Sequence, residues 1–410
     1  MNADGKRIYS FLKTIAFTRA AGSDQEKRAA WILADEIRAM GFEVKLEEFA
    51  IHTDEATAQM KVLEPYEKTY CVDGVGFAKP TPAGGITAAF LYADDYRKGV
   101  VDVKDKLCLF GEMSSKEKQL AEDGIAGILH VRGNAARMDD PATPTGSYSK
   151  QEMRGKITAL EIAARDAMEL VDRGALKVWF TLQGEQKQST SQNVVVTLPG
   201  TERSDEIIVV GAHYDSVGVG DGACDNGGGS AIVMELLRCF AADPPKRTFR
   251  FVWFGAEEIG LEGSKAYLRA HKEELNCCRL MINVDVAGAT VGRNFVRATG
   301  EESIAHYIEF MAKESGYVAD IKQGLMGSDS TPFAGRKIPA VGFGRGPARY
   351  AEICHSEEDT LRYISPDALE QTAQFVLQFA RRMDEAKEFP IPQTIPENVA
   401  KRISEMLEEE

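Results

Sequence analysis

Five separated segments of the 410-residue chain carry side chains that could ligate a metal ion or move a proton. In chain order, these side chains belong to His213, Asp215, Asp225, Glu257, Glu258, Asp285 and His355. Imidazole nitrogens and carboxylate oxygens form a donor set that suits Zn²⁺. Such a set can hold two ions a few ångströms apart, bridged by one carboxylate and one water. These residue types therefore predict hydrolysis by a metal-activated water.

His213 and Asp215 follow the apolar run IIVVGA at 207–212. If the strand continues through them, the two side chains point to the same face. The carboxylate can then accept the second ring N–H of a metal-bound imidazole, which fixes the tautomer of the ring. A histidine in a polar turn is an equally good interpretation of this segment alone.

The segment GACDNGGG at 222–229 places Asp225 in a glycine-rich turn, ahead of a helix expected at about 228–241. Phosphate binding is the alternative, because glycine turns before helices bind phosphate groups. The segment lacks the Gly-Lys-Ser/Thr of a Walker loop, and the carboxylate would repel a phosphate. A carboxylate on a tight turn is better suited to holding a cation.

Glu257 and Glu258 come directly after the apolar run FRFVWF at 249–254. Adjacent glutamates project in different directions, so one can bind a metal while its neighbour reaches a metal-bound water. A solvated helix start is the alternative.

Asp285 ends the run LMINVD, where a buried charge needs either a metal or a salt-bridge partner. His355, in the acidic segment CHSEEDT, is on its own more typical of a surface histidine than of a ligand.

The remaining histidines and the cysteines predict no second site. We interpret the other four histidines as surface or structural residues: His52, His130, His271 and His306. The seven cysteines are odd in number and include no CxxC pair. This argues against a disulfide framework and against a cysteine zinc site.

The elements that position the candidate residues alternate between strands and helices. A capping box at 23–26 starts a helix that Gly41 ends, and a strand follows at 42–46. IPAVGF at 338–343 is a further buried strand, and residues 365–386 form a helix. Because each candidate ligand lies at or just beyond the end of a strand, the pattern predicts an open α/β sheet with its site at that edge.

The pattern of expected strands, helices and turns along the chain predicts three regions. Residues 1–58 and 190–386 form a discontinuous α/β catalytic domain, with a mixed, largely parallel sheet sandwiched by helices. Residues 59–189 form a β-rich inserted domain, and residues 387–410 form a loosely attached acidic tail.

The charge balance excludes two classes of partner. The chain has 49 Lys and Arg against 63 Asp and Glu, a net charge of −14, which disfavours nucleic acid and anionic membrane surfaces. No stretch approaches the roughly 20 apolar residues of a membrane span. The first residues lack the apolar core and cleavage site of a signal peptide, which predicts a cytoplasmic protein, with a processed secreted form as the alternative. The oligomeric state is not predicted.

The five segments together resemble one family. HYDS, GACDNGGG, FGAEEIGLEGS, INVDVAG and CHSEEDT, in this order and spacing, look like the co-catalytic di-zinc metallo-aminopeptidases, a family that also contains glutamate carboxypeptidase. The resemblance covers roughly residues 1–55 and 190–385. Through VKDKLCLF, AEDGIAGILHV and ITALEIAARDAMEL, the inserted region resembles a protease-associated domain.

The resemblance implies a role for each candidate residue and two Zn²⁺ ions, replaceable by Co²⁺ or Mn²⁺. The implied ligands are His213 and Asp285 for one zinc, Glu258 and His355 for the other, and Asp225 as the bridge. Asp215 would support His213, and Glu257 would be the general base. The family also implies a cis peptide bond between Asp225 and Asn226.

Two positions depart from the family pattern. Cys354 stands before the last histidine, where the family often has an oxyanion-stabilising tyrosine, and Tyr350 is a weak substitute. The loop Gly327-Ser328-Asp329-Ser330 replaces a family segment that usually reads Ser-Asp-His.

The function that follows is an aminopeptidase acting on peptides. A carboxypeptidase of the same family is the main alternative, because Arg345 and Arg349 could clamp an α-carboxylate. A single-zinc aminoacyl cyclase and a catalytically inactive binding homologue also remain open.

Overall fold

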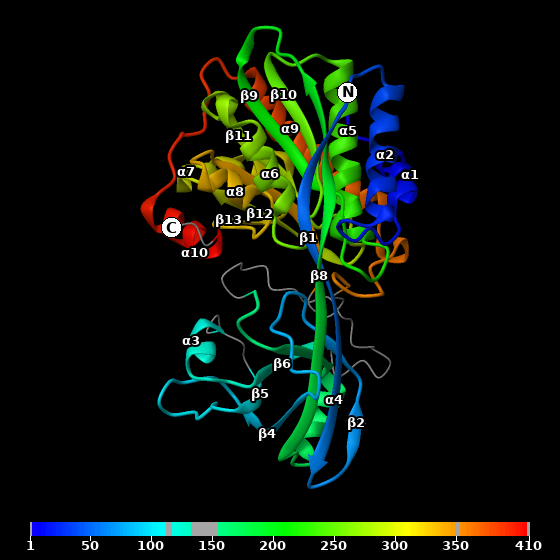
Figure 1. The fold of residues 1–410 in the computed structure, drawn as a ribbon. Helices are drawn as coiled ribbons and strands as arrows, with labels where there is room; N and C mark the ends of the chain where they lie inside the picture. Colours follow the sequence, from blue (N-terminus) through cyan, green and yellow to red (C-terminus); the bar gives the residue numbers. More distant parts are fainter. Residues whose placement is uncertain (1, 112–116, 133–153, 349–352, 408–410) are drawn as a thin grey trace. The chain divides into compact units, whose positions relative to one another are not determined.

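The computed structural model describes residues 2–111, 117–132, 154–348 and 353–407. The chain divides into a larger unit, Met1–Ile51 with Ser189–Glu410, and an inserted unit, His52–Gln188. Figure 1 shows the elements of both units. No helix in the described part of the chain is long and apolar enough to cross a membrane.

The larger unit contains a mixed, largely parallel sheet. Its strands are β8 (Lys177–Leu198), β9 (Arg203–His213), β10 (Arg247–Phe254), β11 (Cys278–Val284), β12 (Gly292–Thr299), β13 (Asp320–Gln323) and β14 (Ala340–Pro347). Their order is β13-β12-β14-β11-β9-β10-β8. Strand β9 is parallel to its neighbours β10 and β11. Strand β11 is also parallel to β14, and β12 is parallel to β13. The pairs β12–β14 and β10–β8 are antiparallel. The expected fold class is confirmed for this unit.

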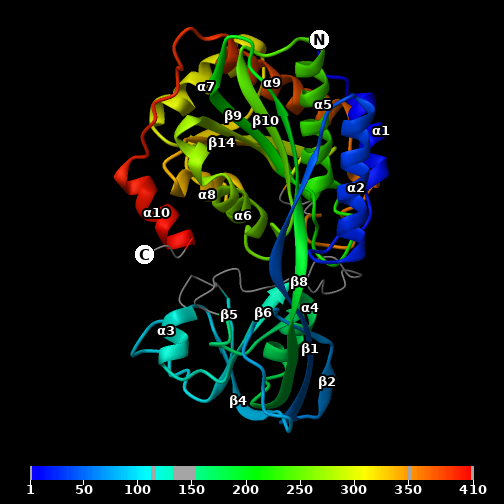
Figure 2. The ribbon, with the colours of Figure 1, turned by 45° about the horizontal axis from the view of Figure 1, so that its top comes forward.

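The central strands are buried because helices cover both faces of the sheet. The helices are α1 (Gly5–Ile15), α2 (Asp24–Ala39), α5 (Gly228–Ala242), α6 (Glu262–Ala270), α7 (Glu302–Ser315), α8 (Ser330–Gly335), α9 (Pro366–Glu385) and α10 (Glu397–Leu407). Ile208 and Val210 of β9 pack in the core with α1, α2, α5, α7 and α9, while Ile207 and Val209 pack with α6 and α8. Figure 2 shows α6 and α8 on one side and α1, α2 and α5 on the other.

Local sequence signals place several helix ends. Ser23 caps α2 by accepting from the Glu26 N–H at 3.1 Å, and Ser365 caps α9. The Glu26 side chain differs from a capping box, because it accepts from the Gly22 and Ala256 N–H groups and turns into the core. Short helical turns also occur at Lys272–Cys277 and Leu361–Tyr363, whereas the turn Ala223–Gly227 has non-helical backbone angles at Asp225 and Asn226.

The C-terminal helix α10 is more firmly attached than the acidic composition of the tail predicted. Val399 and Ile403 are buried and form a small core with Ala334 of α8. Their spacing of four residues places them on one face of the helix, so the charged residues of the tail face away from this contact.

The inserted unit combines strands with short helices in its described part. Its elements are β1 (Lys45–Glu64), β2 (Lys68–Tyr70), β3 (Val72–Gly74), β4 (Ile86–Ala93), β5 (Lys106–Phe110), β6 (Gly127–Arg132), β7 (Ala159–Ala163), α3 (Glu117–Glu122), α4 (Ala164–Asp172) and part of β8. Strands β4 to β7 are parallel neighbours, and β3–β7 and β4–β8 are antiparallel. Leu107 and Cys108 of β5 contribute to separate cores, so both faces of this sheet are covered.

Candidate active site

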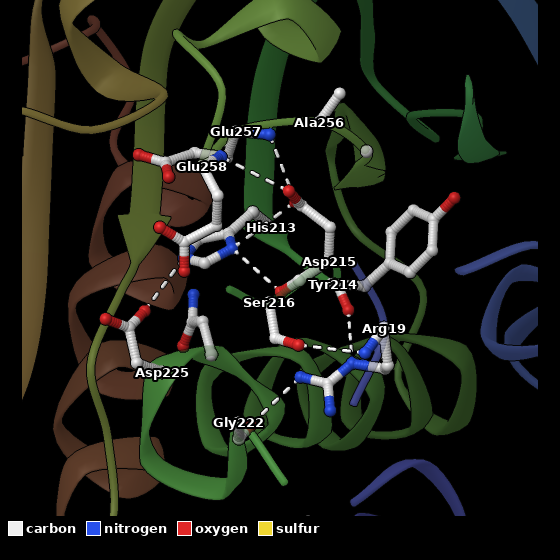
Figure 3. A network of polar contacts seen from close by, with 12 residues as sticks. Arg19, His213, Tyr214, Asp215, Ser216, Gly222, Asp225, Ala256, Glu257 and Glu258 are labelled. Atoms are coloured by element: carbon white, nitrogen blue, oxygen red, sulfur yellow. Dashed lines mark hydrogen bonds and ion pairs between the residues drawn. The ribbon is translucent and has the colours of Figure 1, made fainter. Parts of the chain in front are cut away.

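The candidate residues gather beyond the carboxyl ends of the parallel strands β9, β10 and β11. His213 is the last residue of β9, and the buried Asp285 directly follows β11. Glu257 and Glu258 lie in the turn after β10, which contains Ala256 at φ 54°. Parallel strands bring these ends to one edge of the sheet, which is where sequence analysis placed them. Figure 3 shows His213, Glu257 and Glu258 close together.

The Asp225 carboxylate lies between two imidazoles. One carboxylate oxygen, Oδ1, is 3.1 Å from His213 Nε2, and the other, Oδ2, is 3.3 Å from His355 Nε2. His213 Nε2 is also 3.2 Å from Asp285 Oδ1, and His355 Nε2 is 3.2 Å from Glu258 Oε2. The arrangement is therefore two groups of three residues that share Asp225.

This donor set fits divalent metal ions. Two donors that are each about 2.1 Å from a tetrahedral Zn²⁺ lie about 3.4 Å apart, close to the 3.1–3.3 Å separations in both groups. Potential ligand atoms also lie within 4.8 Å of one another in the sets His213–Glu257–Asp285 and His213–Asp225–Glu258. The mixture of imidazole and carboxylate donors suits zinc.

The crowding of carboxylates shifts the proton affinities of the two imidazoles upward. Burial by itself would lower the pKa of His213, but the charges of Glu257 and Asp285 outweigh it, and the pKa lies well above the usual value. Burial is likewise outweighed at His355, where Asp225 and Glu258 raise the pKa to about 11. The protein without metal therefore holds protons where cations would otherwise balance the carboxylates.

Asp215 supports both the first imidazole and the glutamate pair. It is fully buried, and its Oδ1 lies 3.5 Å from His213 Nδ1. Its two oxygens accept hydrogen bonds from the backbone N–H groups of Glu257, at 3.0 Å, and Glu258, at 3.2 Å. Figure 3 shows these two contacts. One carboxylate thus fixes the turn that carries the candidate base and a candidate ligand.

Glu257 combines burial with proximity to the candidate ligands. Burial raises the pKa of its carboxyl well above the usual value; the charge of His213 opposes this shift, and that of Glu258 adds to it. A carboxylate whose proton affinity is raised is a better acceptor for a proton from water near neutral pH. The geometry therefore suits a general base.

The peptide bond between Asp225 and Asn226 is cis, as predicted. The Asn226 side chain donates to the Val284 carbonyl at 2.9 Å and accepts from the Gly229 N–H at 3.0 Å. These contacts join the glycine-rich turn to the end of β11 and to the start of α5. Asp225 and Asp285 are thereby held next to each other.

Sequence analysis missed two residues that position the Asp225 turn. Asp359 is buried and accepts from the N–H groups of Cys224, at 2.6 Å, and Asp225, at 3.0 Å. Burial raises the pKa of its carboxyl to about 7. Asp359 belongs to the segment CHSEEDT, but nothing in the sequence distinguishes it from the exposed Glu357 and Glu358.

The second missed residue is Arg19, which lies in the segment that connects α1 to α2 and is fully buried. Its guanidinium donates to backbone carbonyls of three chain segments, and Figure 3 shows the bonds to Tyr214 and Gly222. The acceptors are Ile15, Phe17, Tyr214, Asp221 and Gly222. Arg19 therefore connects the loop after β9 with the turn before Asp225, and no local pattern around Arg19 indicates this.

Asp329 lies in the loop 327–330, which differs from the family pattern. It is also fully buried, at the N-terminal end of α8. Burial raises the pKa of its carboxyl to about 7, and the charges of His213 and Asp285 influence it. It therefore lies within electrostatic reach of the site. Its neighbour Ser328 accepts a hydrogen bond from the Asn283 side chain at 2.8 Å, two residues before Asp285.

The other residues singled out from the sequence lie apart from the metal-binding groups or outside the described residues. Tyr350 and Arg349 lie outside the described residues. Arg345 donates to the Ala289 carbonyl at 2.8 Å and to Asn294 Oδ1 at 3.1 Å. His52 and His306 are exposed, and His271 pairs with Glu47 at 3.0 Å.

The fold and the site define a metal-dependent hydrolase of the α/β type. Residues 193–380 match the family model described as Peptidase family M28. Aminopeptidase YwaD of Bacillus subtilis (strain 168) is 27% identical, over 98% of this chain and 90% of that protein. Carboxypeptidase Q of Mus musculus is 26% identical, over 91% of this chain and 83% of that protein.

Two solved structures resemble the whole chain. BSAP, a zinc aminopeptidase from Bacillus subtilis, has a TM-score of 0.75 and 25% identity, over 97% of this chain and 98% of that one. A peptidase M28 precursor from Shewanella amazonensis SB2B has a TM-score of 0.77 and 26% identity, over 95% of both chains. The similarity therefore includes the inserted unit as well as the larger one.

Proposed function

We propose that this protein is a zinc aminopeptidase that hydrolyses the N-terminal peptide bond of peptides. The observation that carries the proposal is the Asp225 carboxylate between His213 and His355, each imidazole also next to a second carboxylate. Similarity to a zinc aminopeptidase over nearly the whole chain supports the same reaction.

We assign His213 and Asp285 to one zinc, Glu258 and His355 to a second, and Asp225 to both. The distances support this division, because each imidazole is 3.2 Å from its own carboxylate partner. When bound, the ions would lower the pKa of water towards 7 and polarise the scissile carbonyl. Co²⁺ and Mn²⁺ accept the same donors and would substitute.

Glu257 would accept the proton of the attacking water and pass it to the leaving amine. Its backbone N–H is held by Asp215 at 3.0 Å, so the backbone that carries the carboxylate is fixed before substrate binds. A preorganised base needs no rearrangement during the reaction. Asp215 is a positioning residue in this scheme, because it acts through Glu257 and His213.

The free α-amine of a peptide suits a site this rich in carboxylates. An α-amine can either coordinate a bound metal ion or hydrogen-bond to a carboxylate that no zinc neutralises. An α-carboxylate would need a free arginine, and the Arg345 guanidinium already donates to Ala289 and Asn294. The engaged Arg345 side chain and the similarity to a zinc aminopeptidase therefore favour the aminopeptidase over the carboxypeptidase.

We further propose that residues 59–189 form a protease-associated-like domain. The parallel strands β4 to β7, with α3 between β5 and β6 and α4 directly after β7, support a compact accessory domain. The sequence resemblance through VKDKLCLF falls on β5 and the turn before it.

The decisive test replaces the base and keeps the ligands. Glu257→Gln keeps the size of the side chain but removes the proton acceptor. It should retain the metal content of the parent and lose about 10²–10⁴-fold in kcat on aminoacyl anilides. The matched control is Glu273→Gln, whose side chain is 87% exposed. Normal hydrolysis by Glu257→Gln would remove Glu257 from the mechanism.

The direction of cleavage is tested with two blocked dipeptides. A carboxyl-blocked dipeptide with a free amine should be cleaved, and an amino-blocked dipeptide with a free carboxylate should not. The reverse pattern would assign the chain to the carboxypeptidase activity. Metal analysis of the same preparation should find two zinc ions per chain, which also separates this site from a single-zinc cyclase.

A further inference from the structure

Two cysteines precede proposed metal ligands in the chain and touch each other in space. Cys224 comes directly before Asp225, and Cys354 comes directly before His355. The Cys354 thiol is in hydrogen-bond contact with the Cys224 thiol. The 3.3 Å contact between Asp225 and His355 joins the same two segments one residue further on.

The two cysteines differ in how firmly they are held. Cys224 is fully buried; its N–H donates to Asp359 at 2.6 Å, and its carbonyl accepts from the Ala287 N–H at 3.0 Å. Cys354 is partly exposed and packs against the edge of the main core. Cys354 is thus the more exposed residue of the two, and Cys224 is the one with a fixed backbone.

We propose that Cys224 and Cys354 form an oxidation site, in which a peroxide converts the two thiols to a disulfide next to the metal centre. In the first step, Cys354 Sγ attacks the peroxide; the O–O bond breaks, and a sulfenic acid and water form. In the second step, Cys224 Sγ displaces the sulfenic hydroxyl group, which leaves as a second water. Overall, two thiols lose two electrons and two protons, and one hydrogen peroxide is reduced to two waters.

The disulfide would disturb the second ligand group. Two hydrogen-bonded thiols are further apart than the about 2.05 Å of an S–S bond, so one segment must move. Because the Cys224 backbone is held by Asp359 and Ala287, the movement falls on Cys354 and His355. The His355 imidazole would then leave its place beside Asp225 and Glu258. This consequence rests on the proposed metal site, whereas formation of the disulfide does not.

The test treats the full-length protein with hydrogen peroxide, blocks the remaining thiols and maps the cross-linked peptides. The reaction is run at about pH 8.5, because a thiolate and not a thiol attacks the peroxide. The variants are Cys354→Ser, Cys224→Ser and the control Cys71→Ser, which changes an exposed cysteine of the inserted unit.

The expected result is one cross-linked pair, Cys224 with Cys354, in the parent and in Cys71→Ser, reversed by dithiothreitol. Cys354→Ser and Cys224→Ser should each lack this pair. The parent alone decides the question if either serine variant fails to fold. Separate alkylation of Cys224 and Cys354 after oxidation, or a cross-link joining Cys277 to Cys278 instead, would overturn the proposal.

Metal retention is measured on the same samples, by competition with a zinc-binding dye. Oxidation should weaken zinc binding about tenfold, as expected when a ligand loses its support, and reduction should restore it. Full retention with the disulfide formed would overturn the link to the ligands. A disulfide in a protein that never binds zinc would instead contradict the proposed function and leave the thiol pair established.

Discussion

The Asp215 carboxylate accepts a hydrogen bond from the backbone N–H of Glu257 at 3.0 Å. Its other oxygen accepts from Glu258 at 3.2 Å, and the same side chain lies 3.5 Å from His213 Nδ1. A single buried carboxylate therefore positions the backbone of the proposed base, Glu257, and of the proposed ligand Glu258. The same carboxylate also orients the imidazole of the proposed ligand His213. Its effect on catalysis is carried by the backbone of the turn.

We expect Asp215→Asn to reduce kcat and zinc affinity about 10–100-fold while the fold remains intact. An asparagine offers only one oxygen, so its NH₂ group would face one of the two backbone N–H groups. The matched control is Asp205→Asn, an exposed position on the same strand, β9. Steady-state kinetics and a chelator competition would check the result, and equal values in both variants would contradict it.

Asp359 is expected to act on the metal site through the backbone. Asp359→Asn removes one of the acceptors for the Cys224 and Asp225 N–H groups, which loosens the turn that carries the shared ligand. Zinc affinity should fall about tenfold, as is typical when a supporting hydrogen bond is lost. Glu357→Gln, an exposed neighbour, is the control. Unchanged zinc affinity in Asp359→Asn would show that the turn needs no such support.

Arg19→Met should destabilise the protein by about 3–5 kcal/mol, because buried carbonyls are left without a donor. Arg19 donates to five backbone carbonyls in three segments of the chain. Urea unfolding of the zinc-free protein would give the free energy, with the exposed Arg28→Met as the control. A loss no larger than that of Arg28→Met would mean that water replaces the guanidinium.

The metal-free protein should lose stability as the pH rises from about 5 to about 8. Burial raises the pKa of Glu26 to about 8, and those of Asp329 and Asp359 to about 7. Between the usual carboxyl pKa and these values the folded state binds more protons than the unfolded state, so the free energy of unfolding falls with pH. The raised pKa values of His213 and His355 act in the same direction above about pH 6.5.

Thermal unfolding in the presence of EDTA, recorded at several pH values, measures this dependence. The zinc-loaded protein should show a weaker dependence, because the cations offset the carboxylate charge and displace the protons from the imidazoles. A melting temperature that rises with pH in EDTA would be inconsistent with the assigned directions.

Local sequence determined the elements and the types of the site residues. Continuous apolar runs such as FRFVWF predict strands buried on both faces, and FRFVWF lies within β10. Ser23 and Ser365 cap the helices that they were expected to start. These features depend on neighbouring residues, so a short stretch of sequence is enough to specify them.

Tertiary structure alone decided which groups meet. Arg19 reaches the Tyr214 carbonyl 195 residues away, and Asp359 holds the Cys224 N–H across 135 residues. Hydrogen bonds over such separations leave no periodic or local trace, so Asp359 could not be distinguished from its exposed acidic neighbours. The same reason applies to the Cys224–Cys354 contact. The sequence by itself determined the chemistry available at the ends of the strands, and the packing of the sheet decided which of those side chains share one site.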